Sequence, residues 1–179
     1  QILEIVSILD PEQAVPGVDQ ALDGPPVEIV WTEAPLQDKG NAIAHLSSQL
    51  IGNGVLKGDI AVLVTTKYMI GTITAILNDL GIKAEAKYAN KIEADESMWS
   101  NSIKVMTVHS AKGLEFQAVF LVGIDELKSP DQAEDAEERA GFVRRARLNL
   151  VGPTRAKDLL FVIAARENGY IKRLKERAS

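Results

Sequence analysis

One short segment, Thr107 to Phe116, combines residue types that suit the binding of a phosphate or a sugar. Lys112 offers a partner for a phosphate group, and Glu115 offers an acceptor for a hydroxyl group. Small side chains would let the backbone approach such a ligand closely, and they stand at Ser110, Ala111 and Gly113. A polar loop with ordinary surface charges accounts for the same residues, and their spacing alone does not separate the two interpretations.

A second segment, Asn149 to Lys157, contains a single arginine, Arg155, directly before an apolar run. An arginine held rigidly in front of a buried strand suits the stabilisation of charge that develops on a transferred phosphoryl group. An arginine paired with a surface carboxylate is the alternative interpretation.

The residues that several kinds of chemistry require are absent from the sequence. The chain has neither G-x-x-x-x-G-K-[ST] nor G-x-G-x-x-G, so we expect no phosphate-wrapping P-loop within it. It has no cysteine, which excludes disulfides, thiolate metal ligands and a cysteine nucleophile. Two histidines, His45 and His109, are too few for a zinc site, and we expect no metal site. No G-x-S-x-G elbow accompanies His109, which disfavours acyl transfer.

The composition is that of one compact domain: of 179 residues, 46% are apolar and 25% are charged, and aromatic residues are few. No apolar stretch approaches the roughly 18 residues of a membrane span. The first residues, Gln1 to Glu4, have neither a basic region nor a cleavage-like site. We therefore expect a cytoplasmic protein, neither inserted in a membrane nor secreted.

The net charge of −5 is unevenly distributed. Residues 139–179 hold eleven of the twenty Lys and Arg residues, including all eight Arg, against three acidic residues. A basic quarter on an acidic body permits a local anion-binding face, but the charge pattern by itself favours solvated helix faces. Three arginines before Arg155 either add positive potential near it or face solvent: Arg144, Arg145 and Arg147.

These segments must be positioned by alternating strands and helices, which predict an α/β class with a largely parallel sheet. The predicted strands cover residues 27–31, 60–64, 84–88, 103–108, 118–122 and 159–163, and the predicted helices cover residues 38–50, 70–80, 130–150 and 170–177. The Thr107 segment then begins at the carboxyl end of a parallel strand, where open α/β sheets bind ligands.

The two ends of this pattern need separate treatment. Residues 1–26 are expected to form a helix, Ile2 to Leu9, and a connector rich in Pro, Gly and Asp, belonging to the same domain as residues 27–179. The sequence Ser129-Pro130-Asp131-Gln132 resembles a capping box and predicts that a long helix begins at Pro130.

The two candidate segments resemble motifs of one protein family. Residues 107–116 match motif V of the UvrD/Rep-type superfamily 1 DNA helicases, T-[LV]-H-x-A-K-G-L-E-[FW], at every fixed position. Residues 151–156 are similar to motif VI, Y-V-[AG]-x-T-R-A, in the expected order along the chain. Residues 59–82 resemble the family's I-A-V-L-x-R segment, with Thr65 where Arg is common. The resemblance covers about residues 59–165 and implies the second RecA-like motor domain, a three-layer sandwich without a P-loop.

The resemblance also implies roles for individual residues. Arg155 would be the arginine finger that acts on the γ-phosphate of ATP. Glu115, with Gly113 and Lys112 beside it, would contact the nucleotide, and Thr107 and His109 would contact the backbone of single-stranded DNA. One loop would then touch both ligands, which would couple ATP hydrolysis to DNA movement.

The chain departs from the family pattern in several places. Leu150 occupies the usual Tyr position of motif VI, and Pro153 precedes Thr154 where helix is common. The P-loop and the Mg²⁺ ligands of the family belong to the first motor domain, and an Asn-Tyr-Arg-Ser motif would be expected just before Gln1. We therefore expect a piece of a longer protein that is inactive as an isolated ATPase.

The interpretation favoured by the sequence is the C-terminal motor domain of an ATP-dependent DNA helicase or translocase, moving 3′ to 5′ and involved in DNA repair. Its expected partners are ATP with Mg²⁺, single-stranded or partly duplex DNA, and a P-loop domain of the same protein. Two alternatives stay open: a non-catalytic module that binds nucleic acid or protein, and a subunit linked to a nuclease.

Overall fold

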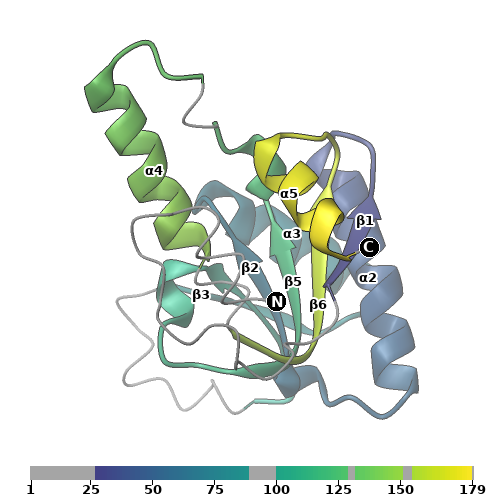
Figure 1. The fold of residues 1–179 in the computed structure, drawn as a ribbon. Coiled ribbons are helices and arrows are strands. Elements are labelled where there is room, and N and C mark those ends of the chain that lie inside the picture. Colours follow the sequence, from purple (N-terminus) through teal and green to yellow (C-terminus); the bar gives the residue numbers. More distant parts are fainter. Residues whose placement is uncertain (1–26, 89–99, 129–131, 151–154, 179) are drawn as a thin grey trace.

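The computed structural model describes residues 27–88, 100–128, 132–150 and 155–178 (Figure 1). The predicted helix Ile2–Leu9 and its connector lie outside these residues, so the division of the chain at residue 26 stays a prediction.

The described strands form one six-stranded sheet in the order β1-β6-β5-β2-β4-β3, and every pairing in it is parallel. The α/β class with a largely parallel sheet is thus confirmed. The strands are β1 (Val27–Trp31), β2 (Ile60–Val64), β3 (Ala84–Lys87), β4 (Ile103–Thr107), β5 (Phe116–Val122) and β6 (Ala156–Ala164).

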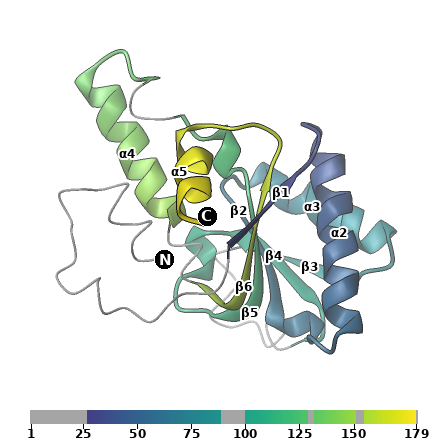
Figure 2. The same cartoon turned by 45° about the vertical axis from the view of Figure 1, so that its right-hand side comes forward.

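Helices cover both faces of the sheet (Figure 2). α2 (Leu36–Gly52) and α3 (Tyr68–Asp79) pack on one face. α5 (Gly169–Ala178) and the last part of α4 (Ala136–Leu150) pack on the other, while the first part of α4 projects from the body (Figure 1). This arrangement confirms the predicted three layers. Short 3₁₀ turns complete the described elements: η3 (Lys57–Asp59), η6 (His109–Ala111) and η7 (Ile124–Glu126).

The core consists of aliphatic layers on either side of the sheet. All five residues of β2 are buried, because the strand lies inside the sheet and is covered on both faces. Its alternate side chains divide between the layers: Val62 and Val64 pack toward α2 and α3, and Ala61 and Leu63 pack on the opposite side.

The long helix α4 begins at Ala136, so the predicted start at Pro130 is wrong. Pro130 itself lies outside the described residues, but residues 132–135 are described and are not α-helical. The cap comes from Asp135, whose Oδ1 accepts a hydrogen bond of 2.7 Å from the Glu138 N–H. The Glu138 carboxylate in turn accepts the N–H of Glu134 at 2.8 Å. This reciprocal capping lies five residues after Pro130 and begins the helix there.

The connection from β4 to β5, residues 108–115, is unusual in that it links parallel strands without an α-helix. β2 lies between these two strands in the sheet, so the connection crosses the face of β2. Val108, Ala111 and Leu114 pack into the same apolar layer as the β2 side chains beneath them. The connection therefore runs, anchored by burial, from the edge of the sheet where strands end to the edge where they begin.

Candidate functional site

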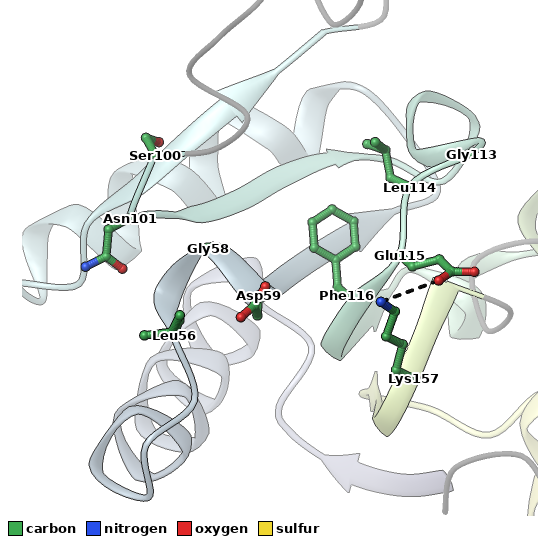
Figure 3. Close-up of a pocket in the computed structure, with 10 residues that line it drawn as sticks. All are labelled: Leu56, Gly58, Asp59, Ser100, Asn101, Gly113, Leu114, Glu115, Phe116 and Lys157. Carbon is green, nitrogen blue, oxygen red and sulfur yellow. Dashed lines mark ion pairs between the residues drawn. The ribbon is translucent and has the colours of Figure 1, made fainter.

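We call the edge of the sheet at which the parallel strands begin the amino edge, and the edge at which they end the carboxyl edge. A cavity of about 670 Å³ opens at the amino edge (Figure 3). This amino-edge cavity is lined by residues that precede or open β2, β4, β5 and β6: Leu56, Gly58, Asp59, Ser100, Asn101, Gly113, Leu114, Glu115, Phe116 and Lys157.

Glu115 and Lys157 form the charged wall of the amino-edge cavity. Their side chains make an ion pair of 3.5 Å, and both are more than half exposed, at 61% and 58% (Figure 3). Such an exposed pair contributes little to stability, about 0–1 kcal/mol, so either side chain can turn to a ligand at small cost.

Arg155 stands at the same edge, directly before β6, and is partly buried. Its Nη1 donates a long hydrogen bond of 3.4 Å to the carbonyl oxygen of Leu114, next to Glu115. The structure thus brings Arg155, Gly113 and Glu115 together, although 41 residues separate Arg155 from Leu114. Leu150 lies at the end of α4 with its side chain outside the described atoms, and Pro153 lies outside the described residues.

The small residues of the Thr107 segment are small for different reasons. Gly113 has φ +82°, which side-chain-bearing residues rarely adopt, and no atom lies within 4 Å of the place a Cβ would take. Ala111 is fully buried in the core, so packing limits its size, and the expectation that it lets a ligand approach is wrong. Lys112 is exposed and is not among the residues that line the amino-edge cavity.

A second cavity, of about 720 Å³, opens at the carboxyl edge. This carboxyl-edge cavity contains the two residues expected to contact DNA, Thr107 at the end of β4 and His109 at the start of η6. Its lining comes from segments that follow β2, β4 and β5 and from α4: Thr65, Thr66, Lys67, Thr107, Val108, His109, Ser110, Glu126, Leu127, Lys128, Arg145 and Asn149.

Thr107 shapes the first turn of the β4–β5 connection. Its Oγ1 accepts the Ser110 N–H at 3.1 Å and shares a hydrogen bond of 2.8 Å with the Ser110 hydroxyl. The hydroxyl therefore caps the turn that follows the strand, whereas the neighbouring His109 is exposed. The two expected DNA contacts thus differ: Thr107 is buried and positions the turn, and His109 is open to a ligand.

A buried ion pair supports the carboxyl edge, and nothing in the sequence pattern indicated it. Lys39 of α2 is 1% exposed and donates to both carboxylate oxygens of Asp125, at 3.1 and 3.0 Å, and to Glu126 at 3.0 Å. Asp125 also accepts the Ala165 N–H at 2.8 Å. This network ties together α2, the end of β5 and the end of β6.

Arg145 lines the carboxyl-edge cavity, on the side of Thr107 and His109. Of the two alternatives for this arginine, positive potential near Arg155 is not supported, because α4 carries it to the opposite edge of the sheet, and its side chain is exposed. Arg144 is exposed on the same helix, and the side chain of Arg147 lies outside the described atoms.

A polar cluster borders the amino-edge cavity at β3 and β4. The fully buried Lys104 donates to the hydroxyl groups of Ser100 and Ser102, at 2.8 and 2.7 Å. Ser100 also donates to Glu85 at 2.8 Å, and Lys87 pairs with Glu85 at 3.1 Å. Desolvation raises the pKa of Glu85, but the bonds from Ser100, Lys87 and Ser102 and the charge of Lys104 outweigh it and lower the pKa from 4.5 to about 2.

Two absences hold for the residues that the structure describes. Among them, no group of three or more His, Cys, Asp or Glu side chains is placed to hold a metal ion. Within the same part of the chain, no helix has the length and apolar character that crossing a membrane requires.

Comparison with known proteins identifies one family. The family model for UvrD-like helicase C-terminal domains matches residues 82–167. The ATP-dependent DNA helicase PcrA of Bacillus subtilis is 39% identical over 95 residues, which is 53% of this chain and 13% of that protein. DNA helicase II of Escherichia coli is 41% identical over 68 residues, which is 38% of this chain and 9% of that protein. The chain thus corresponds to a small part of these relatives.

Two solved structures share the fold. The C-terminal domain of a possible DNA helicase from Lactobacillus plantarum WCFS1 superimposes with a TM-score of 0.62 and 15% identity, over 99% of this chain and 92% of that one. The Hef helicase domain of Pyrococcus furiosus gives a TM-score of 0.51 and 13% identity, over 79% of this chain and 28% of that one. At these identities the similarity supports the fold alone.

Proposed function

Because residues 82–167 form a UvrD-like helicase C-terminal domain, we propose that this chain is the second motor domain of an ATP-dependent DNA helicase or translocase. The motor moves 3′ to 5′ along single-stranded or partly duplex DNA and acts in DNA repair in the cytoplasm. A P-loop domain elsewhere in the same protein completes the nucleotide site.

The observation that carries this proposal is the path of residues 108–115. The segment begins beside Thr107 in the carboxyl-edge cavity and ends at Glu115 in the amino-edge cavity. One short covalent segment, packed in the core at Ala111, therefore joins the two cavities. This continuity supports a motor that couples a nucleotide at one edge to DNA at the other.

The amino-edge cavity fits half of a nucleotide site. Glu115 supplies a carboxylate that can accept the hydroxyl groups of a ribose, and the open space beside Gly113 admits a ligand close to the backbone. Arg155, held near Leu114, supplies a guanidinium for phosphate oxygens, and Lys112 and Lys157 add positive charge nearby. ATP with Mg²⁺, when bound, supplies the phosphoryl group whose hydrolysis drives movement, and the metal ligands belong to the P-loop domain.

In this arrangement Arg155 is the arginine finger. Its guanidinium stabilises charge that grows on the γ-phosphate during hydrolysis and contributes less to the bound ground state. At the other edge, the exposed His109 and the small part of Thr107 that reaches the cavity contact the DNA backbone without selecting a base sequence.

The arginine-finger role is tested by Arg155→Ala in the full-length protein. We expect DNA-stimulated ATP turnover to fall by about 10³- to 10⁵-fold, while equilibrium binding of a non-hydrolysable ATP analogue stays close to that of the unchanged protein. Arg166→Ala is a matched control, because Arg166 also bonds a carbonyl oxygen, that of Asp125, but at the opposite edge. The Arg166→Ala protein should retain its DNA-stimulated ATP turnover.

Two outcomes would contradict the proposal. Unchanged turnover in the Arg155→Ala protein would remove the arginine-finger role. Robust Mg²⁺-dependent ATP turnover by the isolated 179-residue chain would overturn the division of the nucleotide site between two domains.

A further inference from the structure

Tyr68 opens α3 at the carboxyl edge and is 66% exposed. An aromatic ring with this much surface in water adds little to the core, because the hydrophobic contribution of a side chain follows the area that is buried. The position therefore calls for another explanation than packing.

The ring of Tyr68 is nevertheless held in place. Its hydroxyl donates to the Glu126 carboxylate at 3.2 Å, and the other oxygen of that carboxylate accepts the buried Lys39 ammonium at 3.0 Å. The pKa of Tyr68 is raised above 10.0 by desolvation first and by Glu126 second, so the phenol keeps its proton and remains a donor at neutral pH. An exposed aromatic ring is thus fixed through Glu126 to a rigid buried ion pair.

The surroundings of Tyr68 suit an anionic chain. Its neighbour Lys67 and its partner Glu126 both line the carboxyl-edge cavity. The cavity lining carries three cationic side chains against that one carboxylate, which also shares the ammonium of Lys39 with Asp125: Lys67, Lys128 and Arg145. These cations come from three different elements, so they border the cavity on several sides, and Lys128 also lies over the Phe142 ring of α4 at 5.5 Å.

A positively charged groove with an exposed aromatic ring at its border is the arrangement that binds single-stranded nucleic acid. We propose that Tyr68 is a stacking platform for one base of single-stranded DNA, whose phosphates are bound by Lys67, Lys128 and Arg145. This inference rests on the proposed function and adds a base contact to the backbone contacts of Thr107 and His109. Stacking accepts every base, so the contact grips the strand without reading its sequence.

The test separates a stacking contact with a base from an electrostatic contact with a phosphate. The full-length protein is titrated with a fluorescently labelled oligothymidylate and with an abasic oligonucleotide of the same length, at one salt concentration. Both probes carry the same phosphates, so the ratio of their dissociation constants reports the base contacts. Loss of one stacked base by Tyr68→Ala should lower this preference for the thymidylate by about 5- to 150-fold. Tyr68→Phe, which keeps the ring, should retain most of it.

Two controls make the result specific. Trp31→Ala removes another exposed aromatic ring, 48% exposed, at the end of the outer strand β1, and should leave the preference unchanged. Lys67→Gln should weaken both probes equally, because it removes a phosphate contact, and should reduce the slope of log affinity against log salt by about 0.7.

The outcomes are distinguishable from failure of the motor proposal. If Tyr68→Ala keeps the full preference for the thymidylate while DNA still stimulates ATP turnover, the stacking role is wrong and the motor stands. If the unchanged protein shows no DNA-stimulated ATP turnover, the proposed function fails, and the stacking role that rests on it falls too. An equal loss of affinity for both probes in Tyr68→Ala would also overturn the stacking role, since it would indicate disturbed structure.

Discussion

Removal of the Lys39 ammonium should be among the most damaging single changes to the stability of this fold. Lys39→Met keeps most of the aliphatic side chain but leaves the Asp125 carboxylate, only 1% exposed, without its ammonium partner and with the Ala165 N–H as a donor at 2.8 Å. A buried carboxylate that loses its counter-ion costs about 3–5 kcal/mol, a large fraction of the roughly 5–15 kcal/mol that stabilises a domain.

The expected loss is measured by urea unfolding followed by circular dichroism at neutral pH. The midpoint of thermal unfolding should fall by about 6–20 °C for a domain of this size. A second variant, Lys39→Met with Asp125→Asn, removes both charges and should recover much of the loss, because the unpaired charge causes most of it.

An exposed ion pair provides the matched control. Lys175 and Glu167 approach to 2.8 Å, closer than the buried pair, but both side chains are about half exposed. Lys175→Met should therefore cost much less stability than Lys39→Met, even though it also removes the contact of the ammonium with the Trp31 ring. If Lys39→Met costs no more than Lys175→Met, burial does not decide the energy of the pair, and the reasoning is refuted.

Two further predictions concern the charged cluster at β3 and a glycine with a positive φ. In Glu85→Gln, we expect the free energy of unfolding to fall by about 1–2 kcal/mol at pH 7, a figure discounted because the Glu85 side chain is 26% exposed. The lowered pKa of Glu85 stabilises the fold only while the carboxylate is charged, so urea unfolding should show this difference shrinking as the pH falls below 4.5 and vanishing near 2. A difference that stays constant with pH would contradict that cause. In Gly123→Ala, the new Cβ would overlap Thr65 Oγ1 in a backbone with φ +93°, so thermal unfolding should show a loss of about 2–5 kcal/mol. A stability within about 1 kcal/mol of the unchanged protein would exclude both the backbone strain of the alanine and the overlap.

Much of the fold could be predicted because the strands are buried on both faces. Continuous apolar runs such as residues 60–64 have few alternatives to a buried parallel strand, and this strand has the predicted limits. The last strand was placed correctly but is longer than predicted, since it begins at Ala156 instead of Leu159. Its first residues are mostly exposed, and hydropathy gives no signal for a strand segment that faces water.

The sequence-based predictions were wrong or incomplete where particular hydrogen bonds, either local or between distant residues, determine the structure. The start of α4 was misplaced because Ser-Pro-Asp-Gln and Asp-Ala-Glu-Glu both resemble helix starts, and only the observed bonds of Asp135 and Glu138 separate them. The Lys39–Asp125 pair joins residues 86 apart, and a lysine in an amphipathic helix is ordinarily expected to face solvent. No spacing rule reaches across such a distance.

The candidate site was located by its motifs and divided by the fold. The segment containing Thr107 and Glu115 was expected at the carboxyl end of one strand, and its first half is there. Its second half lies at the opposite edge, because the eight residues of the connection, which include the turn η6, cross the face of β2 before β5 begins. Spacing along the sequence could not reveal this, since a turn and a crossover can have the same length.

The crossover has a consequence for how sequence signatures of this kind are understood. Within the segment from Val108 to Phe116, the side chains of Val108, Ala111 and Phe116 are buried and that of Leu114 is partly buried. The residues that can contact a ligand, among them His109 and Glu115, lie between these positions and are exposed. The buried positions of the signature therefore reflect how the segment packs on the sheet, and the exposed positions reflect what it binds. A protein that had lost its motor activity could keep the buried positions intact, so only the outward-facing positions report whether the chemistry survives.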